Sequence, residues 1–274
     1  MTEPARDPRT GPVEENLLDF LAGLAATPGF ASERRTDVTT WSSDVEHPLF
    51  NGIAGARFPA DEAAARTGEV LGAYLARGRP FLWWTTPSTT SPRLEQVLSY
   101  LGMQRADSPG MHLAPDGAGP AAVRDPAPEV EVHPVPSHDR VLDEVLVAAF
   151  GMSASLVEPL ARSVGGLDAT RLHEVLALVD GAPAGGGSLW VSGRTAGLYN
   201  IGTLEAARGR GVGTAVTAAL VARARELGCT EVVLHATAAG LGVYRRLGFT
   251  EVCTESQHLW VPPGAGRHAV RTDV

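Results

Sequence analysis

The stretch that decides the fold is residues 203–214, Thr203-Leu-Glu-Ala-Ala-Arg-Gly-Arg-Gly-Val-Gly-Thr214. An apolar segment at 197–203 predicts a strand immediately before it. Residues 213–227 repeat apolar side chains at helical spacing and end at Gly228, which predicts a long helix immediately after it. The glycine-rich loop therefore joins a strand to the first turn of a helix.

This loop has the composition of a phosphate-binding site. Glycines at 209, 211 and 213 remove side chains, so the backbone can approach a ligand closely with its N–H groups exposed. The start of the following helix adds a partial positive charge, and Arg208 and Arg210 can add charge-assisted contacts to phosphate oxygens. The glycine spacing differs from the dinucleotide-binding fingerprint, so we predict a pyrophosphate site of another kind.

The pattern around the loop predicts an α/β fold with a mixed sheet, because strands and helices alternate along the second half of the chain. Strands are expected at 129–135, 174–180, 187–192, 197–203, 230–235 and 251–260, and helices at 139–150, 156–164, 213–227 and 240–247.

The first half of the chain carries a weaker version of the same pattern, with strands expected at 50–58, 80–86 and 103–113 and helices at 61–75 and 91–101. In each half a short helix ends in a similar tripeptide, Leu101-Gly102-Met103 and Leu247-Gly248-Phe249. We therefore predict an internal duplication. Three tryptophans of this half fit either core filling or an aromatic wall for a substrate; they are Trp41, Trp83 and Trp84.

Proline and glycine cluster between the two halves and predict a linker at 115–128. The domains on either side would then span 16–114 and 129–262. Residues 1–15 are polar and proline-rich, so we expect a disordered tail there, and we expect a second flexible tail at 263–274.

Composition excludes several classes of chemistry. The chain of 274 residues contains no lysine, which excludes Schiff-base catalysis and a Walker-type phosphate loop. Its net charge of −8 argues against nucleic acid and anionic membranes as partners. Two cysteines are too few for a disulfide framework or a cysteine-based zinc site, and we expect no metal. With no signal-peptide pattern at the N-terminus, we expect a cytoplasmic protein.

Two motifs in this order resemble the GNAT acetyltransferase superfamily. Arg208-x-x-Gly211-x-Gly213 resembles its acyl-CoA pyrophosphate loop, and Tyr244-Arg-Arg-Leu-Gly248-Phe249 resembles its Tyr-x-x-x-Gly-Phe signature. The resemblance is strong over 174–262, looser back to 129 and faint over 45–114. It implies a GNAT-like fold in the C-terminal half and a smaller, degenerate GNAT-like N-terminal domain. Because the first half lacks a phosphate loop, we expect it to have lost CoA binding and to act as a lid or substrate wall.

The resemblance also implies acetyl-CoA as the cosubstrate, held between two splayed strands. Backbone groups at 201–203 would pair with the pantetheine arm, and one N–H there would polarise the thioester carbonyl. The N–H groups of residues 210–214 would hold the pyrophosphate. Thr237 stands where many members carry an asparagine, and its side chain reaches less far. The implied cofactor-binding residues are Ile201, Gly202, Thr203, Arg208, Gly209, Arg210, Gly211, Val212, Gly213, Thr214 and Thr237.

The resemblance makes Tyr244 the general acid that protonates the departing CoA thiolate; the alternative is a structural tyrosine in the core. No general base is evident, because residues 194–204 contain no carboxylate. Glu205 and His235 are candidates for the base, and Asn200 is a candidate for holding a water relay. A histidine within a strand is also often structural, so both interpretations of His235 stay open. His173 and Glu174 are further candidates for the base, and Tyr199 is a second candidate for holding the water relay.

The function expected from these features is transfer of an acetyl group from acetyl-CoA to a small-molecule amine. Direct attack in a ternary complex is expected, because neither motif contains a cysteine. Two alternatives stay open: O-acyl transfer on the same fold, and a non-catalytic acyl-CoA-binding or interaction protein. The acidic composition weakly favours a cationic acceptor. The sequence is compatible with either a monomer or a homodimer.

Overall fold

The computed structural model describes residues 7–59, 61–115, 129–137 and 139–264. In the first half the elements are α1 (Thr10–Ala25), β1 (Ala31–Arg34), β2 (Thr39–Ser42), the 3-10 helix η1 (Pro48–Phe50), β3 (Gly52–Ala54), α2 (Ala63–Arg77), β4 (Phe81–Thr85), α3 (Pro92–Tyr100) and β5 (Gln104–Leu113). In the second half they are β6 (Val130–Val135), α4 (Arg140–Ala149), η3 (Ala154–Leu156), α5 (Val157–Gly165), β7 (Leu172–Val179), β8 (Ala182–Ser192), β9 (Thr195–Thr203), η4 (Glu205–Ala207), α6 (Val212–Glu226), β10 (Glu231–His235), α7 (Leu241–Arg246) and β11 (Thr250–Trp260).

These elements confirm most of the sequence-based assignments and correct two of them. The tail expected at 1–15 is wrong from Thr10 onward, because α1 begins there. The strand expected at 50–58 is confined to β3, because η1 precedes it and Gly55 adopts a left-handed φ of 68° just after it. The predicted linker lies outside the described residues from 116 to 128, and so does the C-terminal tail from 265 onward.

The strands of the described residues join one eleven-stranded sheet in the order β1-β2-β3-β4-β11-β5-β10-β9-β8-β7-β6. The predicted duplication is visible in it, because β3-α2-β4-α3-β5 repeats the order of β9-α6-β10-α7-β11. The last strand of each repeat is exchanged: β5 pairs with β10 of the second half, and β11 pairs with β4 of the first half. A cut at 115–128 therefore does not divide the sheet.

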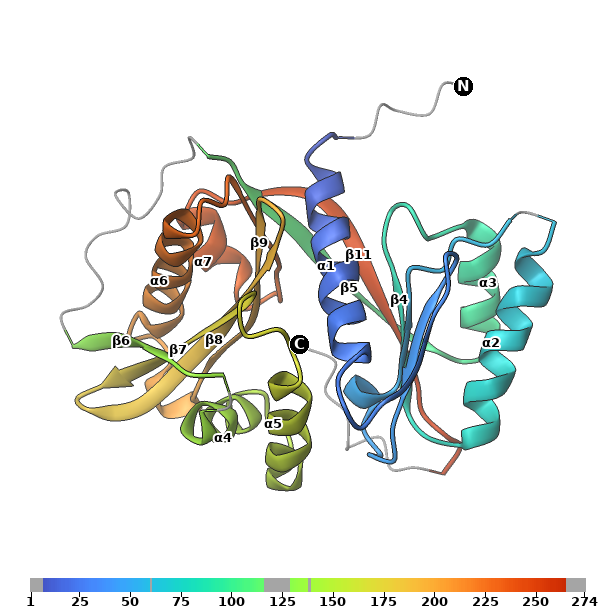
Figure 1. The fold of residues 1–274 in the computed structure, drawn as a ribbon, viewed down its shortest axis with the longest axis horizontal. Helices are drawn as coiled ribbons and strands as arrows, with labels where there is room; N and C mark the ends of the chain where they lie inside the picture. Colours follow the sequence, from blue (N-terminus) through green and yellow to red (C-terminus); the bar gives the residue numbers. More distant parts are fainter. Residues whose placement is uncertain (1–6, 60, 116–128, 138, 265–274) are drawn as a thin grey trace.

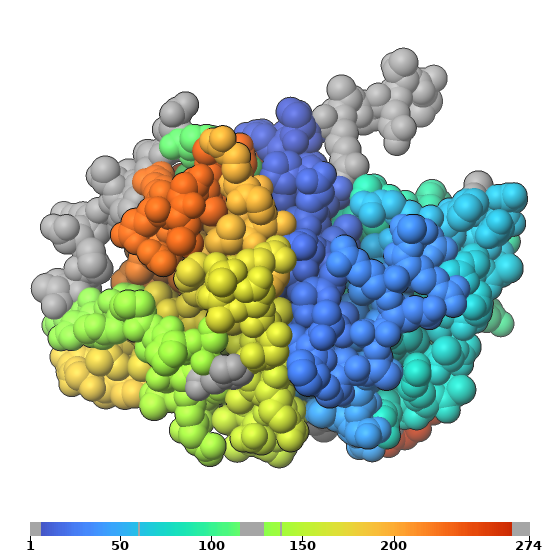
Figure 2. Space-filling model, in the orientation of Figure 1, coloured from blue at the N-terminus to red at the C-terminus, as the bar shows by residue number. Residues whose placement is uncertain are grey.

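Helix α1 lies along the boundary between the two halves (Figure 1). It contacts β8, β9 and β10 on one side and β1 and β2 on the other. Figure 2 shows its residues, in blue, filling the line where the two halves meet on this face. The helix escaped sequence-based prediction because its buried face mixes Leu17 and Leu21 with the polar residues Glu14 and Asn16.

The other helices of the second half cover the two faces of its sheet. A side chain at Gly187 of β8 would point into Val216 of α6, and one at Gly202 of β9 would point into Leu146 of α4. Helices α6 and α4 therefore lie on opposite faces. Phe20 of α1 packs with Val164 of α5, so α1 covers the face opposite α6. No helix within the described ranges is long and apolar enough to cross a membrane.

The core interpretation of the tryptophans is confirmed for two of the three. Trp83 is fully buried in the cluster beneath α2 and α3, and Trp41 is 2% exposed against α1. Trp84 is partly buried and packs against the same cluster as Trp41. Trp41 and Trp83 therefore fill the interior and are not part of an exposed aromatic wall.

Candidate functional site

The glycine-rich loop forms a tight turn ahead of α6. Gly209 and Gly211 adopt left-handed φ values of 79° and 85°, a conformation that side chains disfavour. The backbone at position 213 is not left-handed, so its conformation does not require glycine. A Cβ placed on Gly213 would meet only the hydroxyl of Thr203, at 3.9 Å. The space in front of the first turn of α6 is therefore open, as a ligand approaching the backbone requires.

Two backbone N–H groups of this turn are already used within it. The N–H groups of Arg208 and Arg210 donate to the carbonyls of Glu205 and Ala207, at 3.2 and 3.4 Å. The first bond to the helix start runs from Ala215 N–H to the carbonyl of Gly211, at 3.0 Å. The N–H groups of residues 212–214 have no acceptor inside the helix, as at every helix start.

The two loop arginines differ in their surroundings. The guanidinium of Arg210 lies 2.8 Å from a carboxylate oxygen of Glu129 and 2.8 Å from one of Asp180. These two hydrogen bonds, with the one to Asp180 the stronger, raise the pKa of Arg210. Among the residues that the structure describes, the guanidinium of Arg208 has one hydrogen-bond contact, at 3.5 Å to the carbonyl of Ala149. Arg208 is thus free to meet a phosphate, whereas Arg210 would have to leave two carboxylates.

Strand β9 carries a bulge where the sequence predicted backbone contacts to a cofactor. Its register with β8 shifts so that Gly186 faces Gly202 while Ser188 faces Tyr199. Asn200, inside the bulge, adopts a left-handed φ of 54°. Bulges of this kind re-aim backbone groups and are common beside active sites.

Strands β9 and β10 also stop pairing at this point. Their parallel ladder joins residues 195–198 to residues 231–234 and then ends, although β9 continues to Thr203 and β10 to His235. The end of β9 from the bulge onward therefore has no strand partner on its β10 side within the described residues. A free strand edge of this kind can accept an extended ligand.

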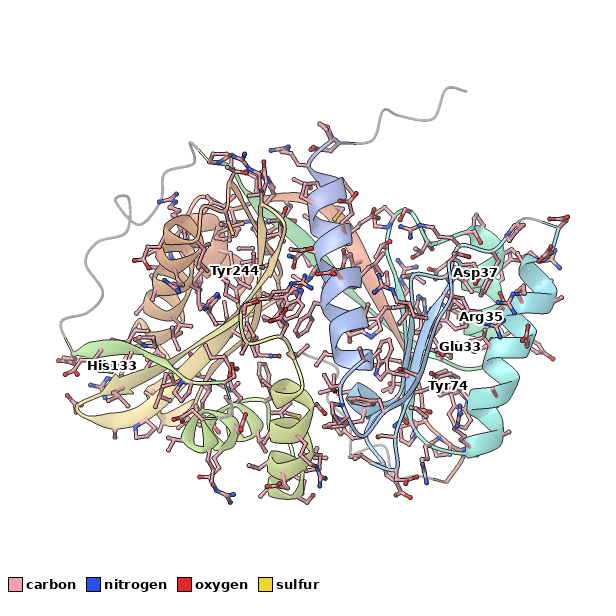
Figure 3. All side chains as sticks on the ribbon, in the orientation of Figure 1. Glu33, Arg35, Asp37, Tyr74, His133 and Tyr244 are labelled. Carbon is pink, nitrogen blue, oxygen red and sulfur yellow. The ribbon has the colours of Figure 1, made fainter. Side chains whose placement is uncertain are left out.

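Tyr244 lies on α7 (Figure 3), on the face of the sheet that α6 covers, because it packs in the same core cluster as Val216 of α6. It is 8% exposed, and burial raises its pKa to about 12. Its hydroxyl makes no hydrogen bond with any residue that the structure describes. A Cβ on Gly240 would lie 2.7 Å from the ring of Tyr244, so the absence of a side chain at position 240 lets the ring pack against the backbone there. Thr237 accepts the N–H of Gly240 at 3.2 Å and so fixes the start of α7.

His235 lies on the opposite face, at the open end of β10. Its Nε2 atom is 2.7 Å from a carboxylate oxygen of Glu255 on β11. Glu255 is 2% exposed, and burial raises the pKa of its carboxyl group. The ring of His235 also lies 6.4 Å from that of Tyr199, whose hydroxyl donates to Asn16 of α1 at 2.6 Å.

The remaining base candidates are placed less favourably. Glu205 is exposed in η4, and Asn200 is half-buried in the bulge. Glu174 accepts the hydroxyl of Ser188 at 3.0 Å on β7, and burial lowers the pKa of His173 beside it. Sequence reasoning missed Glu255, because a glutamate within an alternating strand looks like an ordinary surface residue.

Comparison with known proteins agrees with this geometry. Residues 153–249 match the model of the acetyltransferase (GNAT) family. That segment contains β9, the glycine loop, α6, β10 and Tyr244. No curated protein gives a significant match to the sequence.

Solved structures with the same fold cover most of the chain. A GCN5-related N-acetyltransferase from Kribbella flavida has a TM-score of 0.70 at 20% identity, covering 96% of this chain and 98% of that one. A tandem GNAT protein from the clavulanic acid biosynthesis pathway has a TM-score of 0.59 at 15% identity, covering 92% and 96%. A GCN5-related N-acetyltransferase from Sphaerobacter thermophilus has a TM-score of 0.60 at 17% identity, covering 82% and 76%. The fold is therefore a two-domain GNAT arrangement.

Proposed function

We propose that the protein transfers an acetyl group from acetyl-CoA to a small-molecule amine, because residues 153–249 match the model of the acetyltransferase (GNAT) family. One observation carries the proposal: β9 and β10 stop pairing where β9 bulges and the glycine turn begins. A free strand edge and a helix start with open donors thus occur together.

The residues around this gap fit the chemistry of acetyl-CoA. The N–H groups of residues 212–214 and the start of α6 suit a pyrophosphate, with Arg208 as a nearby cation. The free edge of β9 suits the pantetheine arm, and an N–H near Ile201 would polarise the thioester carbonyl. Arg210 would join the phosphates only after leaving Glu129 and Asp180.

Acid and base would then act from opposite faces of the sheet. The amine nitrogen attacks the thioester carbonyl carbon, so that a C–N bond forms and the C–S bond breaks. His235, held by Glu255, would accept the proton that the amine loses. Tyr244 would donate a proton to the departing sulfur, and its pKa of about 12 keeps that proton in place at neutral pH.

The test begins with CoA binding, measured by titration calorimetry. A Gly213→Glu variant has room for its side chain but places a carboxylate where the pyrophosphate would sit. We expect it to fold normally, because an acid at a helix start is favourable, and to bind CoA at least 100-fold more weakly. Gly72→Glu, at an exposed position of α2, is the matched control and should bind CoA like the wild type.

Thiol release from acetyl-CoA with panels of amines and alcohols then separates the activities. Release that depends on an amine supports the proposal, and release with alcohols alone would assign O-acyl transfer. If CoA binds but no acceptor promotes release, the protein is a non-catalytic acyl-CoA-binding protein. If Gly213→Glu binds CoA as tightly as Gly72→Glu does, the glycine loop is not the phosphate site.

A further inference from the structure

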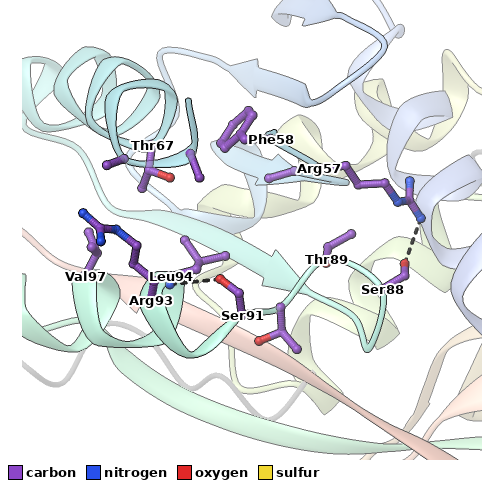
Figure 4. Close-up of a pocket in the computed structure, with 13 residues that line it drawn as sticks. Arg57, Phe58, Thr67, Ser88, Thr89, Ser91, Arg93, Leu94 and Val97 are labelled. Carbon is purple, nitrogen blue, oxygen red and sulfur yellow. Dashed lines mark hydrogen bonds between the residues drawn. The ribbon is translucent and has the colours of Figure 1, made fainter. Parts of the chain in front are cut away.

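The N-terminal half contains a cavity of about 150 Å³ whose lining residues all lie between Ala56 and Val97, away from the gap between β9 and β10. It lies between the ends of β3 and β4 and the starts of α2 and α3 (Figure 4). We propose that this cavity binds a small ligand through an anionic group, a phosphate or a carboxylate. The proposal does not rest on the acetyltransferase activity of the other half.

The size of the cavity limits the ligand. Pockets that enclose drug-sized ligands have roughly 300–1,000 Å³, about two to seven times this volume. The cavity occupies the place in the first repeat that the gap between β9 and β10 occupies in the second. It is too small for a CoA molecule, and the segment from β3 to α2 lacks the glycine turn that precedes α6. The ligand class is therefore a compact anion.

Charge carries the assignment to an anion. Arg57 and Arg93 line the cavity, and none of its thirteen lining residues is acidic, in a chain with a net charge of −8. Neither arginine forms an ion pair with a described residue. Arg57 donates to the neutral hydroxyl of Ser88 at 2.8 Å. By contrast, Arg66 and Arg105 in the same half are each paired with carboxylates.

Neutral donors in the cavity wall add to this charge. Thr67 of α2 is 5% exposed, and its side chain has no hydrogen-bond partner among the described residues. Ser91 accepts the N–H of Leu94 at 3.2 Å and so caps α3, which leaves its hydroxyl proton available to donate. Both hydroxyls can therefore donate to an anionic ligand in the cavity.

The experiment uses backbone amide NMR shifts of the full chain, titrated with inorganic phosphate and separately with acetate. The Gly213→Glu background keeps phosphate away from the loop before α6. We expect at least one probe to give saturable shifts at Thr67 and Leu94, with millimolar affinity. The probe that saturates identifies phosphate or carboxylate as the preferred group.

Three variants make the result specific. Arg93→Ala removes an exposed guanidinium and should weaken the saturating probe at least tenfold, and Thr67→Val should weaken it about threefold. Arg34→Ala removes an exposed arginine of β1 outside the cavity and should change the affinity less than twofold. Shifts that saturate with neither probe overturn the proposal, and so does equal weakening by Arg34→Ala and Arg93→Ala.

Discussion

The Nε2 atom of His235 lies 2.7 Å from a carboxylate oxygen of Glu255, although their strands β10 and β11 are separated by β5. The contact spans β5 at Gly110, which pairs with His235 on one side and with Cys253 on the other. A Cβ on Gly110 would collide with Cys253 of β11 and touch Val13 of α1, so this position of β5 has no room for a side chain. A histidine at the open end of β10 is thus held by a carboxylate that is remote in sequence.

Replacing His235 tests its role as the base. We expect His235→Gln to lower kcat for amine acetylation by about 10²–10⁴, because proton removal from the amine would lack an acceptor. KM for acetyl-CoA should change little. Steady-state rates from pH 6 to 9.5 check this, with His133→Gln on exposed β6 as the control. An unchanged kcat would assign His235 a purely structural role.

Glu255→Gln should change stability and activity in opposite directions. Burial raises the pKa of Glu255, so the folded state binds its proton more tightly than the unfolded state, and its ionisation lowers stability as pH rises through the folded pKa. A neutral amide avoids this loss. We expect about 1 kcal/mol of added stability at pH 7, or roughly 2–4 °C in Tm, and a lower kcat.

The pH dependence provides the check on Glu255→Gln. The gain in Tm over the wild type should disappear below about pH 4.5, the ordinary pKa of the group, where both states of the wild type carry the proton. A variant less stable than the wild type at pH 7 would contradict the raised pKa. Thermal unfolding at several pH values measures both.

Tyr244→Phe isolates the proposed general acid. Because the hydroxyl has no partner among the described residues, its loss should cost less than about 0.5 kcal/mol of stability. We expect kcat to fall by about 10²-fold as the thiolate leaves unprotonated. The wild-type rate should show no loss from Tyr244 ionisation below pH 10, since its pKa is about 12. Equal rates for both proteins would mean that Tyr244 is only a core residue.

The structure shows which parts of this site local patterns can predict. The strand, the glycine turn and α6 follow from spacing within residues 197–227, because each depends on neighbours in the chain. The contact of His235 with Glu255 depends on the exchange of β5 and β11, and no local pattern encodes which remote strand a strand will join. Helix α1 was missed because Glu14 and Asn16 interrupt its apolar face.

The ion pairs of Arg210 predict how CoA affinity can be raised. The two carboxylates on its guanidinium compete with a pyrophosphate for the same charge. Replacing both, as Glu129→Gln with Asp180→Asn, should tighten CoA binding by about 2–10-fold at low salt, and less at high salt because exposed charges are screened. Glu131→Gln, an exposed acid on β6, is the control for titration calorimetry. Weaker binding by the double variant would mean that the carboxylates position Arg210 for the phosphates.

The exchanged strands predict that the two halves unfold together. Strand β11 lies between β4 and β5, so losing either half removes a partner from the other. Leu98 of α3 is fully buried in the N-terminal cluster, far along the chain from α6. We expect Leu98→Ala to lower stability by about 2–5 kcal/mol and to shift one single unfolding transition.

Hydrogen exchange measured by mass spectrometry locates the effect. With coupled halves, Leu98→Ala should speed exchange in peptides of α6 by nearly the same factor as in peptides of α2, because both open only in global unfolding. Leu220 of α6 is fully buried in the C-terminal cluster. Leu220→Ala should likewise speed exchange in peptides of α2 by nearly the same factor as in peptides of α6. Two separate transitions, with α6 protected as in the wild type when Leu98 is replaced, would show that each half is stable alone despite the shared sheet.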